Sequence, residues 1–124
     1  MLLHSIVKPS LAEINAKGLE ITHEDVLFNK FILKAIFPGG QLRPVETVRK
    51  YAEAAGFRVT RVHPLSTNYA RTLEAWAANL EAARDRAIEL TSEEVYDTYM
   101  RYLTGCARYF RSGHLNVVQF TCCK

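Results

Sequence analysis

Residues 2–7 of the chain, Leu-Leu-His-Ser-Ile-Val, are the stretch that decides the fold class. They are almost continuously apolar, which is typical of a strand buried on both faces of a parallel sheet. Ser10, with Glu13 three residues later, predicts a capping box and therefore a short helix that ends at Gly18. A buried strand followed at once by a helix indicates an α/β fold.

The middle of the chain continues with helical and strand signals. Thr22 and Asp25 repeat the helix-start pattern, and Val26–Phe37 is apolar except at Asn29, Lys30 and Lys34. The Pro-Gly-Gly sequence that follows ends this segment, because a residue before proline is pushed out of the helical region. A further helix is expected from Pro44 to Ala55, and then a half-buried strand from residue 57 with a bulge or an early end at Val62.

The clearest periodicity lies in the second half of the chain. From Tyr69 to Leu90 apolar residues recur at alternating spacings of four and three, which predicts a single long amphipathic helix. Thr91 with Glu94 predicts the start of another helix, which ends at Gly113. A closing strand over residues 115–122 is expected, with one slip of register near Val118. The predicted order is β-α-α-α-β-α-α-β, with residues 2–7 as the central strand.

Length and composition define the general class. The chain has 124 residues, of which 48% are hydrophobic and 23% charged, and a net charge of +3. These values predict one globular domain over residues 1–124, and the weak positive charge does not favour nucleic acid as a partner. The first residues do not have the pattern of a signal peptide. Three cysteines without metal-ligand spacing are expected to be buried thiols in a reducing compartment, so we expect a cytoplasmic protein.

Motif searching finds little catalytic machinery. The sequence contains no glycine-rich nucleotide loop and no G-x-S-x-G nucleophile motif. The four histidines do not have metal-ligand spacing, so no metal site is predicted. His4 is the exception, because it lies within an apolar strand and functional side chains collect at strand ends in open α/β folds. Two interpretations are open for it: a buried imidazole that bonds to neighbouring backbone, or one that points into a site.

Two apolar segments are also open to more than one interpretation. Tyr102, Cys106 and Phe110 repeat every four residues, which fits either ordinary core or the wall of a site for a long apolar ligand. The segment Val26–Phe37 fits either a buried helix or a lid that turns its apolar face to lipid and Lys30 and Lys34 to phosphate headgroups.

Several short motifs, taken in order, resemble the mycolic acid cyclopropane synthases. These are S-adenosylmethionine-dependent methyltransferases related to cyclopropane-fatty-acyl-phospholipid synthase, and the resemblance is to their C-terminal portion. The motifs that carry it are Leu2-Leu3-His4-Ser5-Ile6, Ile36-Phe37-Pro38-Gly39-Gly40, Asn68-Tyr69-Ala70-Arg71-Thr72-Leu73 with Ala75-Trp76, Ser92-Glu93-Glu94-Val95-Tyr96, Tyr102-Leu103-Thr104-Gly105-Cys106-Ala107 and Gln119-Phe120-Thr121.

The resemblance implies both a fold and a reaction. The fold is the C-terminal half of a Rossmann-like class I methyltransferase, with about three strands and flanking helices. The reaction is methyl or methylene transfer to a cis double bond of a long lipid acyl chain, free or bound to a carrier protein, through a carbocation. By the same resemblance, His4, the backbone of Ile6, and Tyr69 match positions that hold a bicarbonate ion. The positions that line the acyl tunnel correspond to Phe37, Leu73, Tyr102, Cys106 and Phe110.

The chain also departs from the family pattern. The glycine-rich segment that binds S-adenosylmethionine, and the cysteine and glutamate that complete the bicarbonate site, lie upstream of the matching region. Ala35, His114 and Asn116 stand where glutamate, tyrosine and aspartate are usual. We therefore expect this chain alone to be inactive and not to bind the cofactor. The alternatives are a non-catalytic lipid-binding or membrane-surface module at the inner face of the plasma membrane, and the remnant of a broken gene.

Overall fold

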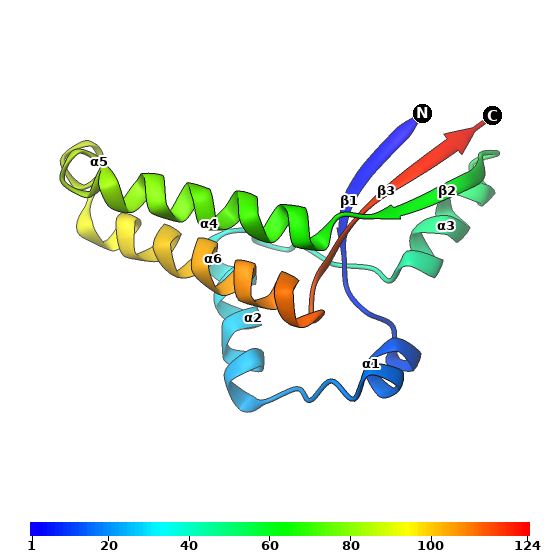
Figure 1. Ribbon diagram of the computed structural model, residues 1–124, viewed down its shortest axis with the longest axis horizontal. Coiled ribbons are helices and arrows are strands. Elements are labelled where there is room, and N and C mark those ends of the chain that lie inside the picture. Colours follow the sequence, from blue (N-terminus) through cyan, green and yellow to red (C-terminus); the bar gives the residue numbers. More distant parts are fainter.

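The computed structural model describes all 124 residues as an α/β arrangement (Figure 1). A small sheet lies at one end, and a pair of long helices extends away from it. None of the helices combines the length and the apolar character that a membrane span requires. The elements in chain order are β1 (Leu2–Val7), α1 (Leu11–Lys17), α2 (His23–Ala35), α3 (Val45–Ala54), β2 (Arg58–Pro64), α4 (Ser66–Ala82), α5 (Arg84–Leu90), α6 (Glu93–Ser112) and β3 (Asn116–Cys123).

The sheet corrects two predictions about the first strand. The strand order is β1-β3-β2, and β3 pairs antiparallel with both neighbours. The central strand is therefore β3, and β1 lies at an edge with its Leu2 side chain 61% exposed. Continuous apolar character predicts burial, but it does not determine which strand lies alongside or in which direction that strand runs.

The irregularity in the sheet falls on β2 and not on β3. The register between β1 and β3 is unbroken from Leu2 to Val7, so the predicted slip near Val118 is wrong. The pairing of β2 with β3 shifts between Val59 and Arg61, close to the bulge expected at Val62. Both Val117 and Val118 are buried because β3 has side chains packed on each face.

Two hydrophobic clusters cover the two faces of the sheet. One cluster is built on Val7, Val118, Phe120 and Cys122, and residues of α3 pack against it. The other joins the opposite face to α2, α4 and α6. It comprises Phe28, Ala70, Leu73, Ala77, Leu103, Cys106, Ala107, Tyr109, Phe110 and Val117. The second cluster contains most of the residues proposed to line the acyl site.

The predicted helix from Tyr69 to Leu90 is two helices. It breaks at Ala83, where α4 ends and α5 begins, and Figure 1 shows α5 end-on at the far end of the α4–α6 pair. Beyond the break Ala87 is half-buried, but Ala83 and Leu90, which the same periodicity places on the packed face, are exposed. The periodicity therefore describes the packed face of α4 better than that of α5, and the break allows the chain to reverse direction into α6.

Three of the six helices, α1, α2 and α6, begin with a side-chain cap. Ser10 and Thr22 each form a complete capping box with the acidic residue three positions later, as predicted. The start of α6 differs by one residue: Ser92 is the N-cap and its hydroxyl accepts a 3.1 Å hydrogen bond from the Val95 N–H. The Thr91 hydroxyl instead donates to a carbonyl of α5.

Helix α2 packs across α6 at a single glycine. The ring of Phe28 lies so close to Gly105 that a Cβ at this position would be 2.3 Å from the nearest ring carbon. Beside this contact, the Tyr109 hydroxyl donates a 2.5 Å hydrogen bond to Asp25, and the Phe28 and Tyr109 ring centroids are 4.9 Å apart. Gly105 is therefore required for the close approach of the two helices.

We predict that Gly105→Ala lowers the free energy of unfolding. Alanine favours a helix by about 1 kcal/mol over glycine, but the new methyl group overlaps the buried Phe28 ring, and such overpacking costs about 1–3 kcal/mol. Urea unfolding followed by circular dichroism measures the difference. Thr104→Ala, at the adjacent exposed position of α6, is the control and is expected to change stability little. A Gly105→Ala variant as stable as the wild type would contradict the prediction.

Candidate functional site

The edge of β1 presents a free backbone N–H at Ile6. Its partner across the sheet, Val117, uses its N–H with the Ser66 hydroxyl (3.2 Å) and its C=O with the Leu65 N–H (2.8 Å). Both groups of Val117 therefore point away from β1, which makes Ile6 and Val117 a non-hydrogen-bonded antiparallel pair. The Ile6 N–H consequently faces the unpaired edge of β1, where it can donate to a ligand.

His4 lies two residues earlier on the same face of β1. Its ring approaches the ring of Tyr69 on α4 edge-on, with centroids 6.4 Å apart and an angle of 68° between the planes. His4 is exposed, so the expectation of a buried imidazole is wrong. Neither side chain forms a hydrogen bond within the chain, which removes the alternative in which His4 bonds to neighbouring backbone. We call these three groups, the Ile6 N–H and the side chains of His4 and Tyr69, the polar cluster; each has free hydrogen-bonding capacity.

The orientation of Tyr69 is determined by two further aromatic rings. Phe110 of α6 packs perpendicular to it at 5.1 Å, and Trp76 of α4 packs at 6.4 Å and 79°. Trp76 belonged to the predicted apolar stripe but was not identified as a site residue. Its spacing of seven from Tyr69, two helical turns, is the sequence signal that could have found it.

A dry apolar wall adjoins the polar cluster. Leu73, Cys106 and Phe110 are buried in one core cluster, against which Ile6, Tyr69 and Tyr102 pack. Phe37, just after α2, is 48% exposed and its ring lies 5.9 Å from that of Tyr102 in an edge-to-face contact. The structure therefore brings the eight sequence-predicted residues into one continuous region. They are His4, Ile6, Phe37, Leu73, Tyr69, Tyr102, Cys106 and Phe110.

Burial keeps the ionisable side chains of this wall neutral. It raises the pKa of the Tyr102 hydroxyl to about 12, with smaller contributions from neighbouring Cys106, Tyr69 and Tyr99. Burial also raises the pKa of the Cys106 thiol to about 12. A cysteine with so high a pKa is a poor nucleophile at neutral pH. Within this chain Phe37 and Tyr102 are the wall residues with exposed surface, whereas Leu73, Cys106 and Phe110 are buried in the core. Cys106 is therefore not suited to form a covalent bond with a ligand.

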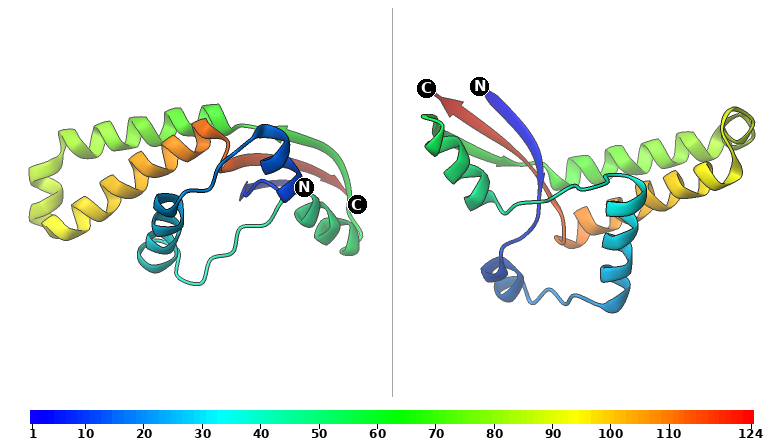
Figure 2. Two further views of the ribbon diagram at one scale, coloured as in Figure 1. Left: turned by 90° about the horizontal axis from the view of Figure 1, so that it is seen from below. Right: turned by 180° about the vertical axis from the view of Figure 1, so that it is seen from behind.

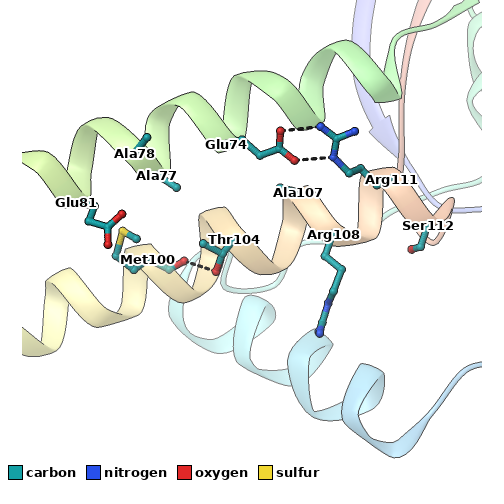
Figure 3. Close-up of a pocket in the computed structure, with 10 residues that line it drawn as sticks. All are labelled: Glu74, Ala77, Ala78, Glu81, Met100, Thr104, Ala107, Arg108, Arg111 and Ser112. Carbon is teal, nitrogen blue, oxygen red and sulfur yellow. Dashed lines mark hydrogen bonds and ion pairs between the residues drawn. The ribbon is translucent and has the colours of Figure 1, made fainter.

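A second concave region lies in the outer groove between α4 and α6 (Figure 3). Its main polar contact is a two-point ion pair in which Arg111 bonds to both carboxylate oxygens of Glu74, at 2.5 and 2.7 Å. None of the predicted site residues lines this groove. The charges of Glu74 and Arg111 neutralise each other, and Glu81 is the one charged lining residue without an ion pair.

Comparison with known proteins identifies the class. The fold is the C-terminal part of a Rossmann-like S-adenosylmethionine-dependent methyltransferase. The cyclopropane synthase MmaA2 from Mycobacterium tuberculosis superimposes with a TM-score of 0.96 at 45% identity, covering 99% of this chain and 43% of that protein. Mycolic acid cyclopropane synthase CmaA1, complexed with SAH and CTAB, gives 0.92 at 50% identity, covering 100% of this chain and 44% of that one.

Sequence comparison identifies the family. Residues 1–120 match the family model "Mycolic acid cyclopropane synthetase". Cyclopropane mycolic acid synthase 3 of Mycobacterium tuberculosis is 58% identical over 121 residues, which are 98% of this chain and 42% of the relative. The chain belongs to the mycolic acid cyclopropane synthetase family, as its motifs indicated, and it spans less than half the length of the curated relatives it matches.

We predict that the three thiols differ sharply in reactivity. Cys106 and Cys122 are buried, whereas Cys123 is exposed, contrary to the expectation that all three are buried. At pH 8 a thiol with a pKa near 12 is ionised in about one molecule in ten thousand, so Cys106 should react only after unfolding. Titration with a thiol-specific disulfide reagent should modify one cysteine rapidly in the native chain and three in denaturant.

The variant Cys123→Ser is the matched control for this assignment. In this variant the rapid phase of modification should be absent, and two cysteines should be modified in denaturant. Rapid modification that persists in Cys123→Ser would show that Cys106 or Cys122 is open to water, and would contradict the prediction.

Proposed function

We propose that this chain supplies one wall of the acyl site, and part of an anion site, in S-adenosylmethionine-dependent methyl or methylene transfer to a cis double bond of a long-chain lipid. The observation that carries the proposal is the position of the free Ile6 N–H, His4 and Tyr69 at the border of a dry aromatic wall. The chain's membership of the mycolic acid cyclopropane synthetase family supports the reaction class. A relative bound to SAH and CTAB, a detergent with a single long alkyl chain, supports a cavity for such chains.

The chemistry explains why polar and apolar groups must adjoin. The π electrons of the alkene form a bond to the donated methyl carbon as the carbon–sulfur bond breaks, which leaves positive charge on the acyl chain. S-adenosylmethionine supplies that methyl group when it is bound. Loss of a proton to a base then allows the carbon–carbon bond of the ring to close. Water must be kept away from the cation, and the wall around Leu73 and Phe110 excludes it.

The polar cluster fits a small oxyanion such as bicarbonate. The Ile6 N–H donates in the plane of the sheet edge, and the Tyr69 hydroxyl and His4 imidazole have no partner inside the chain. Donors fixed in advance by strand pairing and ring packing hold an anion without reorganisation when charge develops. The electron-rich face of Tyr69 is also suited to stabilise a nearby cation.

This chain has no segment with the pattern of an S-adenosylmethionine site. The only double glycine, Gly39-Gly40, follows α2 rather than a strand, so it does not form the strand–turn–helix cradle that binds nucleotides. We therefore propose that the remaining portion of the family fold provides the cofactor site, and that this chain alone does not catalyse the reaction.

Calorimetric titration tests whether this chain alone binds the cofactor. We expect no saturable heat when S-adenosylmethionine is added to the purified chain. The cofactor has no phosphate group, but it needs a cleft for its adenosine part, and we propose that other residues of the family fold form that cleft. A chimera in which the chain replaces the matching segment of cyclopropane mycolic acid synthase 3 is expected to bind the cofactor. Stoichiometric micromolar binding to the chain alone would refute the proposal.

The same chimera tests the role of Tyr69. We predict that Tyr69→Phe lowers kcat about a hundredfold or more, as loss of one preorganised donor does elsewhere, and leaves cofactor affinity nearly unchanged. Methylated acyl product is quantified by mass spectrometry. Tyr51→Phe, which alters a tyrosine 60% exposed on α3, is the matched control and should retain full activity. Equal turnover of the two variants would exclude the proposed role of the Tyr69 hydroxyl.

A further inference from the structure

Helix α2 presents an apolar face that no other element covers. Phe28 is buried against α6, and Phe31 and Ile32 pack beside it, so these residues define the inward side of the helix. On the opposite side, the side chains of Val26 and Leu33 are 42% and 37% exposed. Figure 2 shows α2 (blue to cyan) packed on the outside of the α4–α6 pair, at the margin of the molecule.

The same outward side carries two unpaired positive charges. Lys30 and Lys34 lie one turn apart, both are exposed, and neither forms an ion pair. We call the outward residues of this segment, together with Phe37 just beyond the helix, the α2 lysine face; it comprises Val26, Lys30, Leu33, Lys34 and Phe37.

The acidic residues of α2 are held elsewhere. Asp25 accepts hydrogen bonds from the Tyr109 hydroxyl and from its own helix cap, and these bonds lower the pKa of its carboxyl. Glu24 lies 3.8 Å from Arg108 of α6. Both carboxylates therefore lie toward α6, and the α2 lysine face contains positive charge without negative charge.

We propose that the α2 lysine face docks on the surface of an anionic lipid bilayer. A helix that lies in the membrane interface needs apolar side chains that reach the acyl boundary, flanked by lysines that meet lipid phosphates. Val26, Leu33 and the two lysines provide both on one side of α2, and Phe37 adds an exposed ring just beyond the helix. A polar protein surface would leave Val26, Leu33 and Phe37 in contact with polar groups, whereas an anionic bilayer satisfies the apolar and the charged residues together.

The α2 lysine face leads directly into the candidate acyl wall. Phe37 ends this face, and its ring contacts that of Tyr102, which lines the wall. An acyl chain at the bilayer surface would therefore meet Phe37 first and Tyr102 next. Membrane docking through this face does not require methyl transfer, so it can be tested independently of the proposed reaction.

Vesicle flotation of the purified chain tests the proposal. We expect the chain to float with vesicles of phosphatidylcholine and phosphatidylglycerol in equal parts, and to float much less with pure phosphatidylcholine. Each lysine near an anionic surface contributes about 1 kcal/mol, so Lys30→Gln/Lys34→Gln should weaken binding by about 30-fold. Leu33→Gln should also weaken it, because that side chain would no longer reach the acyl boundary.

Matched variants on other surfaces control for nonspecific attraction. Lys17→Gln/Lys50→Gln makes the same change in net charge on α1 and α3, and Leu11→Gln alters a leucine that is 80% exposed on α1. These controls should bind as the wild type does, and circular dichroism should show all variants folded.

Failure of the wild type to float overturns the proposal, as does an equal loss in the controls. Sedimentation in the absence of lipid that shows a dimer lost in Lys30→Gln/Lys34→Gln would assign the face to a second copy instead.

Discussion

The pairing of β3 with a strand on each side is the constraint on which the rest of the structure depends. Because β3 is central, it contributes to both hydrophobic clusters: Val118, Phe120 and Cys122 to the one shared with α3, and Val117 to the one shared with α2, α4 and α6. The unbroken register with β1 also decides which backbone groups of β1 are used inside the sheet. It leaves the Ile6 N–H at the open edge and places His4 on the face that α4 covers. The polar part of the candidate site is thus a consequence of strand register.

The apolar part of the site depends on packing between helices. Phe110 and Leu73, from α6 and α4, are buried at the centre of the larger cluster, and Tyr69 packs on Phe110. A few free polar groups beside an apolar surface are the usual composition of a ligand site, because the apolar part supplies binding and the polar part orientation. In the proposed reaction this border has a further purpose, since a cation must form close to an anion and away from water.

Helix α2 links the interior to the surface. Its inward side is fixed by Phe28 on Gly105 and by the hydrogen bond from Tyr109 to Asp25. These contacts determine the direction of the outward side, with its lysines and apolar residues, and the position of Phe37 at the edge of the acyl wall. A small residue at position 105 therefore influences both the stability of the fold and the orientation of the α2 lysine face.

The sequence by itself determined the local structure and the family. Capping pairs such as Ser10 with Glu13 depend on contacts within one helical turn, so they can be read directly. The motifs around His4 and Tyr69 identified the family that the comparisons confirmed. The tertiary structure alone decided the strand order and direction, the break at Ala83, and the exposure of His4 and Cys123. Each of these depends on what a residue meets across the fold, and hydrophobic periodicity reports that a side chain is buried without reporting its partner.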